Sequence, residues 1–217
     1  MRVNRAGHCC ASLYSIKEET SMDDFDLLLA QLNSYREEII EIQRCLVAIP
    51  ALAPESGGQG EDLKASYIEQ LLREVGVDEL TRYDAPDERV MSGKRPNLVA
   101  KIYGKQRNKT VWVITHMDVV PAGDLSKWDA QPFQLQVKDD MLVGRGTEDN
   151  HQGLVSALIA IKALREMRIE PEFTIGLLIV ADEETGSEYG LEFIMRTGKD
   201  LFRQEDWFLI PDAGDPH

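Results

Sequence analysis

The stretch 111–121, which reads VWVITHMDVVP, decides how the rest of the chain is interpreted. Its first four residues are β-branched or aromatic, which is typical of a buried strand. His116 and Asp118 follow that run with one residue between them. Alternate residues of an extended chain lie on the same side, so both side chains can face one point while Met117 turns away. The stretch therefore predicts a buried strand that ends at a polar site, with an imidazole and a carboxylate suited to binding a metal.

The composition is that of a globular protein with a strongly acidic charge balance. The chain has 217 residues, and its formal net charge of −14 argues against nucleic acid or an anionic membrane as the main partner. The three cysteines, Cys9, Cys10 and Cys45, do not form a disulfide framework, which favours a reducing compartment. Residues 1–19 lack the apolar core of a signal peptide, and no run reaches the length of a membrane span. We therefore expect a cytoplasmic protein.

The hydrophobic periodicity predicts alternating helices and strands from Met22 onward, after an extension over residues 1–21 that we expect to be disordered. A short polar turn over residues 104–109 predicts that the two strands beside it are antiparallel neighbours. The alternation predicts a three-layer α/β/α fold with a mixed sheet. The expected helices cover residues 25–46, 61–75, 152–167 and 187–196, and the expected strands cover residues 80–83, 97–103, 111–115, 133–137, 141–143, 173–180 and 207–210.

Further acidic residues follow the later expected elements, where sites form in open α/β sheets. Asp149 follows a glycine-rich loop and is either a helix N-cap or a carboxylate that bridges two cations. Asp182, Glu183 and Glu184 follow the apolar strand 173–180, and such an acidic run is either a solvated surface or a ligand beside a general base. Asp212 is either a turn residue or a ligand, and His116 is either structural or a ligand. Taken together, one imidazole and several carboxylates favour zinc, with manganese or cobalt possible.

Four blocks of this sequence resemble one enzyme family over about residues 39–212. It is the two-zinc metallopeptidase and amidohydrolase family that contains acetylornithine deacetylase, succinyl-diaminopimelate desuccinylase, aminoacylase, glutamate carboxypeptidase and bacterial dipeptidases. The matching residues are HMDVVPAG at 116–123 with Trp128, Pro132 and Phe133, GRGTED at 144–149, EETGS at 183–187, and Asp212 after a strand.

The resemblance implies a zinc-exopeptidase-like catalytic domain and a role for each matching residue. His116 and Asp212 would hold one zinc ion, Asp149 would bridge two zinc ions, and Glu184 would ligate the second. Glu183 would be the general base, and Asp118 would orient His116. The resemblance also implies a cis peptide bond between Asp149 and Asn150.

The chain departs from the family pattern in two places. Many members have a lysine two residues after the bridging aspartate, where this chain has His151, which we expect in the first turn of a helix. In the family, the second zinc takes a histidine from beyond an inserted lid domain, and His8, His151 and His217 are poor substitutes for it. We therefore expect residues 22–217 to be the N-terminal part of a catalytic domain without its lid, and a homodimer only where the lid is present.

Two functions remain open from the sequence. The first is a metal-dependent hydrolase of amide or peptide bonds, in which a water activated by two zinc ions attacks a dipeptide or an N-acyl amino acid. The second is a truncated, non-catalytic zinc-binding or assembly protein on the same scaffold.

Overall fold

The computed structural model describes residues 24–212, so the extension expected over residues 1–21 lies outside the described part. The helices are α1 (Asp24–Asn33), α2 (Arg36–Ala48), α3 (Asp62–Val75), α4 (Gly153–Glu166) and α5 (Leu191–Thr197), and a short helical segment, η3 (Thr147–Gln152), precedes α4. The strands are β1 (Glu79–Pro86), β2 (Lys94–Ile102), β3 (Gln106–His116), β4 (Gln136–Lys138), β5 (Met141–Val143), β6 (Phe173–Val180) and β7 (Trp207–Leu209).

Within the described residues, five strands form one mixed sheet in the order β1-β2-β6-β3-β7. The central strand β6 pairs antiparallel with β2 and parallel with β3, and β3 pairs parallel with β7. Strand β6 is apolar along nearly its whole length because it is covered on both faces. The expected central strand and the mixed sheet are therefore confirmed.

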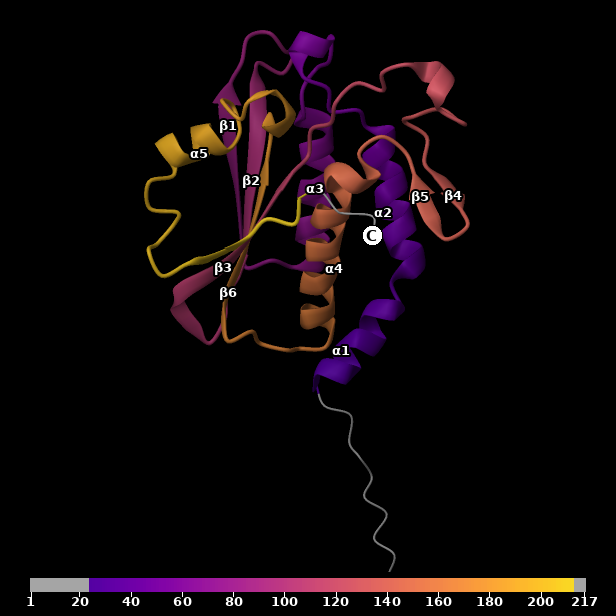
Figure 1. Ribbon diagram of the computed structural model, residues 1–217. Helices are drawn as coiled ribbons and strands as arrows, with labels where there is room; N and C mark the ends of the chain where they lie inside the picture. Colours follow the sequence, from indigo (N-terminus) through magenta and orange to yellow (C-terminus); the bar gives the residue numbers. More distant parts are fainter. Residues whose placement is uncertain (1–23, 213–217) are drawn as a thin grey trace, which may run out of the picture.

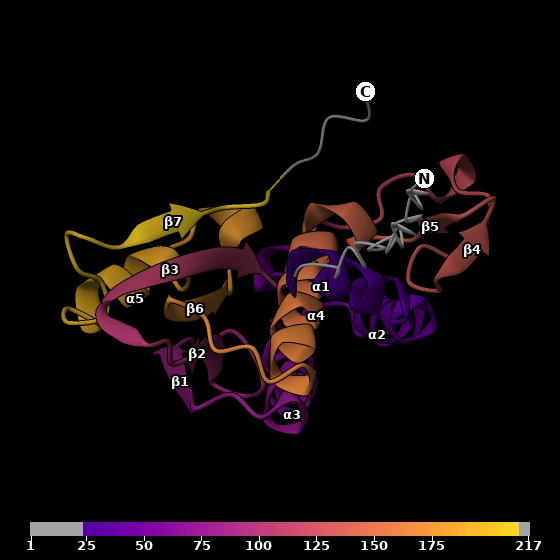
Figure 2. The same ribbon diagram turned by 90° about the horizontal axis from the view of Figure 1, so that it is seen from below.

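The sheet lies between two layers of helices, as Figures 1 and 2 show. Leu177 and Ile179 of β6 pack into the larger core, with side chains of α2, α3 and α4. Leu178 and Val180, the alternate residues, pack with Ile194 of α5 on the opposite face. The alternation of a strand therefore divides the core in two, and the predicted three-layer α/β/α fold is confirmed.

The single helix expected over residues 25–46 is wrong, because the chain turns at Ser34 and Tyr35 between α1 and α2. The backbone N–H of Ser34 donates to Gln31 O at 2.9 Å, and that of Tyr35 donates to Leu32 O at 3.2 Å. The Tyr35 ring is buried, and its hydroxyl donates to Glu166 of α4 at 2.5 Å. The apolar spacing continues through the turn because both helices pack on α4, so periodicity alone does not reveal the break.

Strands β2 and β3 run in opposite directions as predicted, but the prediction that they are neighbours is wrong. Strand β6 lies between them. The turn after β2 crosses the start of β6, where a Cβ on Gly104 would lie 2.4 Å from the carbonyl carbon of Phe173. The backbone N–H of Gln106 donates to Glu172 O at 2.9 Å beside this crossing. A turn that looks like a hairpin loop therefore leaves room for a third strand.

The smaller elements agree with the pattern more closely. Helix α3 ends at Val75, and the next residue, Gly76, has a φ of 79°, the left-handed conformation that favours a glycine after a helix. Strands β4 and β5 form the expected separate hairpin.

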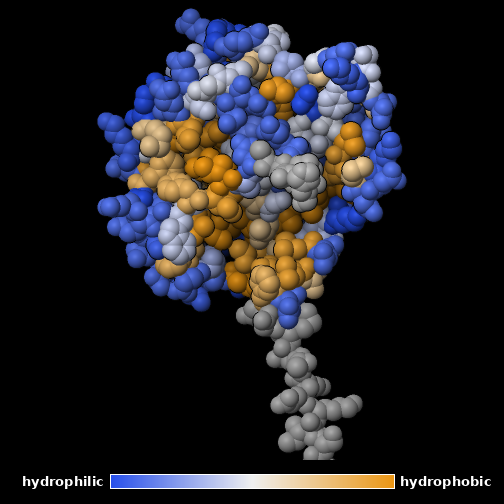
Figure 3. All heavy atoms as spheres, viewed as in Figure 1, coloured by the Kyte–Doolittle hydropathy of each residue, from blue (hydrophilic) through white to orange (hydrophobic). Residues whose placement is uncertain are grey.

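Hydrophobic residues gather at the surface over β7 and around α1 (Figure 3). Among the described residues, no helix has both the length and the apolar character that crossing a membrane requires.

Candidate metal centre

Three parallel strands bring most of the predicted site residues to one edge of the sheet. His116 ends β3, the pair Glu183–Glu184 follows β6, and Asp212 follows β7. Because these strands run in the same direction, their carboxyl ends lie at the same edge. Asp149 reaches this edge from η3, at the start of α4. Segments that lie far apart in the sequence therefore converge on one imidazole.

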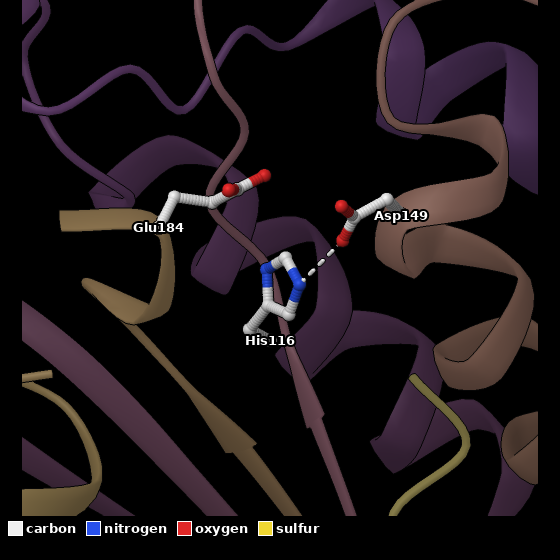
Figure 4. Close-up of side chains that lie close together, drawn as sticks. All are labelled: His116, Asp149 and Glu184. Atoms are coloured by element: carbon white, nitrogen blue, oxygen red, sulfur yellow. Dashed lines mark hydrogen bonds and ion pairs between the residues drawn. The ribbon is translucent and has the colours of Figure 1, made fainter. Parts of the chain in front are cut away.

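His116 lies at the centre of this cluster and is 1% exposed. Its Nε2 atom is 2.9 Å from Asp149 Oδ1, and it is 3.9 Å from both Glu183 Oε2 and Asp212 Oδ1. Figure 4 shows the carboxylates of Asp149 and Glu184 directed toward the His116 ring from two sides. One imidazole nitrogen therefore faces a shell of carboxylate oxygens contributed by three other segments.

Asp118 connects the other ring nitrogen of His116, Nδ1, to the turn after β6. The Nδ1 atom of His116 is 3.1 Å from the backbone oxygen of Asp118 and 3.4 Å from its carboxylate. The same carboxylate accepts the backbone N–H groups of Glu183 and Glu184, both at 3.1 Å. Met117, between the two polar residues, packs into the core on the helix side, as the alternation predicts. These contacts fit a role for Asp118 in orienting the imidazole.

The three acidic residues after β6 point in different directions. Asp182 is buried and has a φ of 60°, and its carboxylate accepts the hydroxyl of Thr185 and the backbone N–H of Tyr189. Asp182 thereby closes the turn that carries Glu183 and Glu184. The solvated-surface interpretation therefore fails for Asp182, while the next two carboxylates remain accessible beside His116.

A buried amide links the Asp149 segment to Asp212. The Nδ2 atom of Asn150 donates to Pro211 O at 3.0 Å and to Asp212 Oδ1 at 2.8 Å. The peptide bond between Asp149 and Asn150 is cis, as the resemblance implies. The helix N-cap interpretation of Asp149 fails, because α4 begins after Gln152 and the Asp149 carboxylate faces His116. Sequence reasoning did not find the role of Asn150, which no periodic or motif signal marks.

The charges of the cluster favour a bound cation. Burial lowers the pKa of His116, but the hydrogen bond and the charge of Asp118 outweigh that effect and raise the pKa to about 9. Burial and the neighbouring carboxylate of Asp149 raise the pKa of Glu184 to about 6. Burial also raises the pKa of Glu183, with the negative charges of Asp212 and Asp118 adding to the effect. A divalent cation would relieve the crowding of these negative charges.

The ligand atoms form two overlapping groups, each of which could hold a metal ion. One group is His116, Asp149 and Glu184, and the other is His116, Glu183 and Asp212, with all ligand atoms of a group within 4.8 Å of one another. A nitrogen and several carboxylate oxygens are a donor set that suits zinc or manganese. The structure therefore brings together every residue that the sequence proposed, without assigning them to one ion or the other.

His151 lies in neither group and is fully buried just before α4. Its Nε2 atom is 2.8 Å from the Nζ atom of Lys64, a buried lysine of α3. The sequence predicts His151 in the first turn of a helix, whereas the residue lies in η3, just before α4 begins at Gly153. The contact with Lys64 was not predicted. The sequence shows a lysine on an apolar helix face, but no pattern in it identifies the residue with which that lysine pairs.

Comparisons with known proteins agree with this geometry. Residues 112–216 match the model of peptidase family M20/M25/M40. An uncharacterized metallohydrolase of Methanococcus maripaludis is 38% identical over 192 residues, which cover 85% of this chain and 46% of the relative. A succinyl-diaminopimelate desuccinylase of Wolbachia pipientis is 29% identical over 172 residues, covering 79% of this chain and 39% of the relative.

Solved structures share the fold. The crystal structure of human carnosine dipeptidase 1 superposes with a TM-score of 0.72 at 21% identity, covering 87% of this chain and 41% of that chain. An M20 family metallo-carboxypeptidase from Sulfolobus solfataricus superposes with a TM-score of 0.65 at 26% identity, covering 82% and 37%. The chain spans less than half the length of these relatives. By sequence and by fold, the chain is a relative of peptidase family M20/M25/M40.

Proposed function

We propose that the chain forms the metal-binding part of a hydrolase that cleaves an amide or peptide bond in a dipeptide or an N-acyl amino acid. The observation that carries this proposal is the position of His116 Nε2, 2.9 Å from one carboxylate oxygen and 3.9 Å from two others. The proposal assigns His116, Asp149, Glu184 and Asp212 as metal ligands. Zinc is the proposed metal, and manganese or cobalt would suit the same donors.

The proposed reaction divides the work between the metal site and one free carboxylate. Two bound zinc ions would supply Lewis acidity, which lowers the pKa of a water and polarises the substrate carbonyl. Glu183 would accept the proton of that water as it attacks the carbonyl carbon, and would return the proton to the leaving amine. The Glu183 side chain is 42% exposed, so water and substrate can reach it. Asp118 would hold His116 in position during this exchange.

The second candidate is a non-catalytic zinc-binding or assembly protein on the same scaffold. The observation that favours it is the ligand count, because the two possible ligand groups share one histidine, His116. The other histidine among residues 24–212, His151, faces Lys64 instead. Metal binding without turnover would support this candidate.

Metal analysis joined to a substrate screen tests both candidates. The purified chain should retain zinc after dialysis and should hydrolyse members of a panel of dipeptides and N-acyl amino acids. Glu183→Ala should keep the metal and lose turnover by about 10²–10⁴-fold, the usual contribution of a general base. Glu192→Ala, on the exposed surface of α5, is the matched control and should leave both unchanged. A folded chain that binds no metal, or a fully active Glu183→Ala variant, contradicts the proposal.

A further inference from the structure

A lysine occupies a core position of helix α3. Lys64 is 1% exposed and lies on the same buried face as Ala65, Ile68 and Leu72. An ammonium group without a partner is costly to bury, so such a residue persists only where specific partners compensate. Burial lowers the pKa of Lys64 to about 7, although the negative charges of Asp118 and Glu61 oppose that shift. The partners of Lys64 therefore explain its position.

The hydrogen-bond partner of Lys64 is the ring of His151. The distance from Lys64 Nζ to His151 Nε2 is 2.8 Å, and His151 is fully buried. An ammonium group can only donate, so pairing with protonated Lys64 requires Nε2 of His151 to accept and the ring proton to lie on Nδ1. On its other side the ring packs against the backbone of the loop, where a Cβ on Gly146 would lie 2.8 Å from the ring atom Cε1. The ring therefore has one position, set by Lys64 and by the Gly146 backbone.

That position matters because His151 belongs to the segment that presents Asp149. Asp149 and Asn150 have non-helical backbone angles, so the regular hydrogen bonds of α4 do not fix these two residues. Four hydrogen bonds anchor the segment: Asn150 Nδ2 to Pro211 O and to Asp212 Oδ1, the backbone N–H of His151 to Gly146 O at 2.9 Å, and the His151 ring to Lys64. The Asp149 side chain itself is half exposed. The orientation of its carboxylate toward His116 therefore depends on the hydrogen bonds that fix the backbone of residues 149–151.

We propose that Lys64 is a positioning residue for the candidate metal centre, which holds the Asp149 carboxylate toward His116 by anchoring the His151 ring from helix α3. This inference rests on the proposed metal-binding function and adds a residue to it. Lys64 does not touch the ligand oxygens, so it acts through the backbone of residues 149–151. When Lys64 is protonated, its charge also attracts Asp118, which accepts the backbone N–H groups of Glu183 and Glu184.

Measurements of zinc affinity distinguish a role of Lys64 in positioning Asp149 from a role in the overall stability of the fold. Lys64→Met keeps the length and apolar stem of the side chain but removes the donor. The variant should bind zinc about 10–100-fold more weakly in competition with a chromophoric chelator, as is typical when a residue that supports metal ligands is lost. Leu72→Ala lies two turns further along the same buried face and is the matched control, because it weakens the core without touching His151. Its zinc affinity should stay within about twofold of the wild-type value, well below the loss expected for a supporting residue.

A second measurement tests the pairing without metal. Nitrogen-15 spectra of histidine-labelled, metal-free chain should show the His151 ring protonated at Nδ1, with an Nε2 resonance that shifts in Lys64→Met but not in Leu72→Ala. Wild-type zinc affinity in Lys64→Met, an equal loss in Leu72→Ala, or a His151 ring protonated at Nε2 each overturns the inference. If the wild-type chain takes up no metal, the proposed function fails and the inference fails with it. If the wild-type chain and Lys64→Met bind zinc equally, the inference alone fails.

Discussion

At Gly176 the centre of the sheet leaves no room for a side chain. Gly176 of β6 pairs with Trp112 of β3, and a Cβ at this position would lie 2.4 Å from the fully buried indole ring. Gly176→Ala should lower the free energy of unfolding by about 1–3 kcal/mol, the usual cost of overpacking a core, measured by urea denaturation. Adding Trp112→Phe should relieve the clash, so the double variant should be more stable than the sum of the two single changes predicts. Additive changes would contradict this account.

The burial of Lys64 predicts a pH dependence of stability with a definite sign. The pKa of Lys64 falls from its ordinary value of 10.5 to about 7 in the folded chain. Between these values the unfolded chain binds the proton and the folded chain does not, so the free energy of unfolding contributed by this group rises with pH. One such group contributes a slope of up to about 1.4 kcal/mol per pH unit.

Urea denaturation of the wild type and Lys64→Met at several pH values measures this contribution. The variant should lack the rise between about pH 7 and pH 10, so its stability relative to the wild type should be greatest at the low end of that window. Lys138→Met, which changes a largely exposed lysine, is the control and should leave the rise in place. Equal slopes in the wild type and in Lys64→Met would contradict the assignment of the slope to this residue.

The positions of helices and strands that carry their own hydrophobic periodicity could be predicted from the sequence. Features that depend on contacts between distant parts of the chain could not. Strand β6 and helix α4 carry their own apolar runs, and their predicted positions agree with the structure. The turn between α1 and α2 and the insertion of β6 between β2 and β3 arise from contacts across the fold, which leave no periodic signal. The site divides in the same way. His116 and Glu184 stand at strand ends that a pattern reveals, whereas Lys64 and Asn150 act through partners that only the folded chain brings near.

Strand β7 lies at an edge of the sheet but has the apolar composition of an interior strand. Residues 207–210, WFLI, are apolar on both faces and are all exposed, at 48–59%. Exposed apolar edge strands promote pairing between chains. The chain should therefore self-associate as its concentration rises, and Leu209→Lys should shift it toward the monomer in size-exclusion chromatography with light scattering. Met91→Lys places the same charge at an isolated, 90% exposed position and should leave the association unchanged. Equal effects of the two variants would show that net charge, rather than β7, controls association.

For the whole molecule, the net charge of −14 and the cluster around His116 predict different responses to cations. Any salt screens a diffuse negative charge, whereas a ligand that binds only the folded state stabilises it by an amount that grows with the logarithm of the ratio of ligand concentration to dissociation constant. Zinc at about 100 times its dissociation constant should add about 2.7 kcal/mol to the free energy of unfolding. For a chain of this size, that addition raises the melting temperature by about 5–10 °C.

Magnesium and a ligand variant separate specific binding from screening in the same thermal scan. Magnesium prefers oxygen ligands and octahedral geometry, so at the same ionic strength it should give a much smaller shift than zinc. His116→Ala removes the nitrogen ligand that both candidate groups share, so this variant should lose the zinc shift. The substitution keeps the carboxylates of both candidate groups, Asp149, Glu183, Glu184 and Asp212. The stabilisation that comes from screening of negative charge by salt should therefore remain, which provides an internal control. A zinc shift that survives in His116→Ala would mean that the stabilisation comes from the acidic surface as a whole.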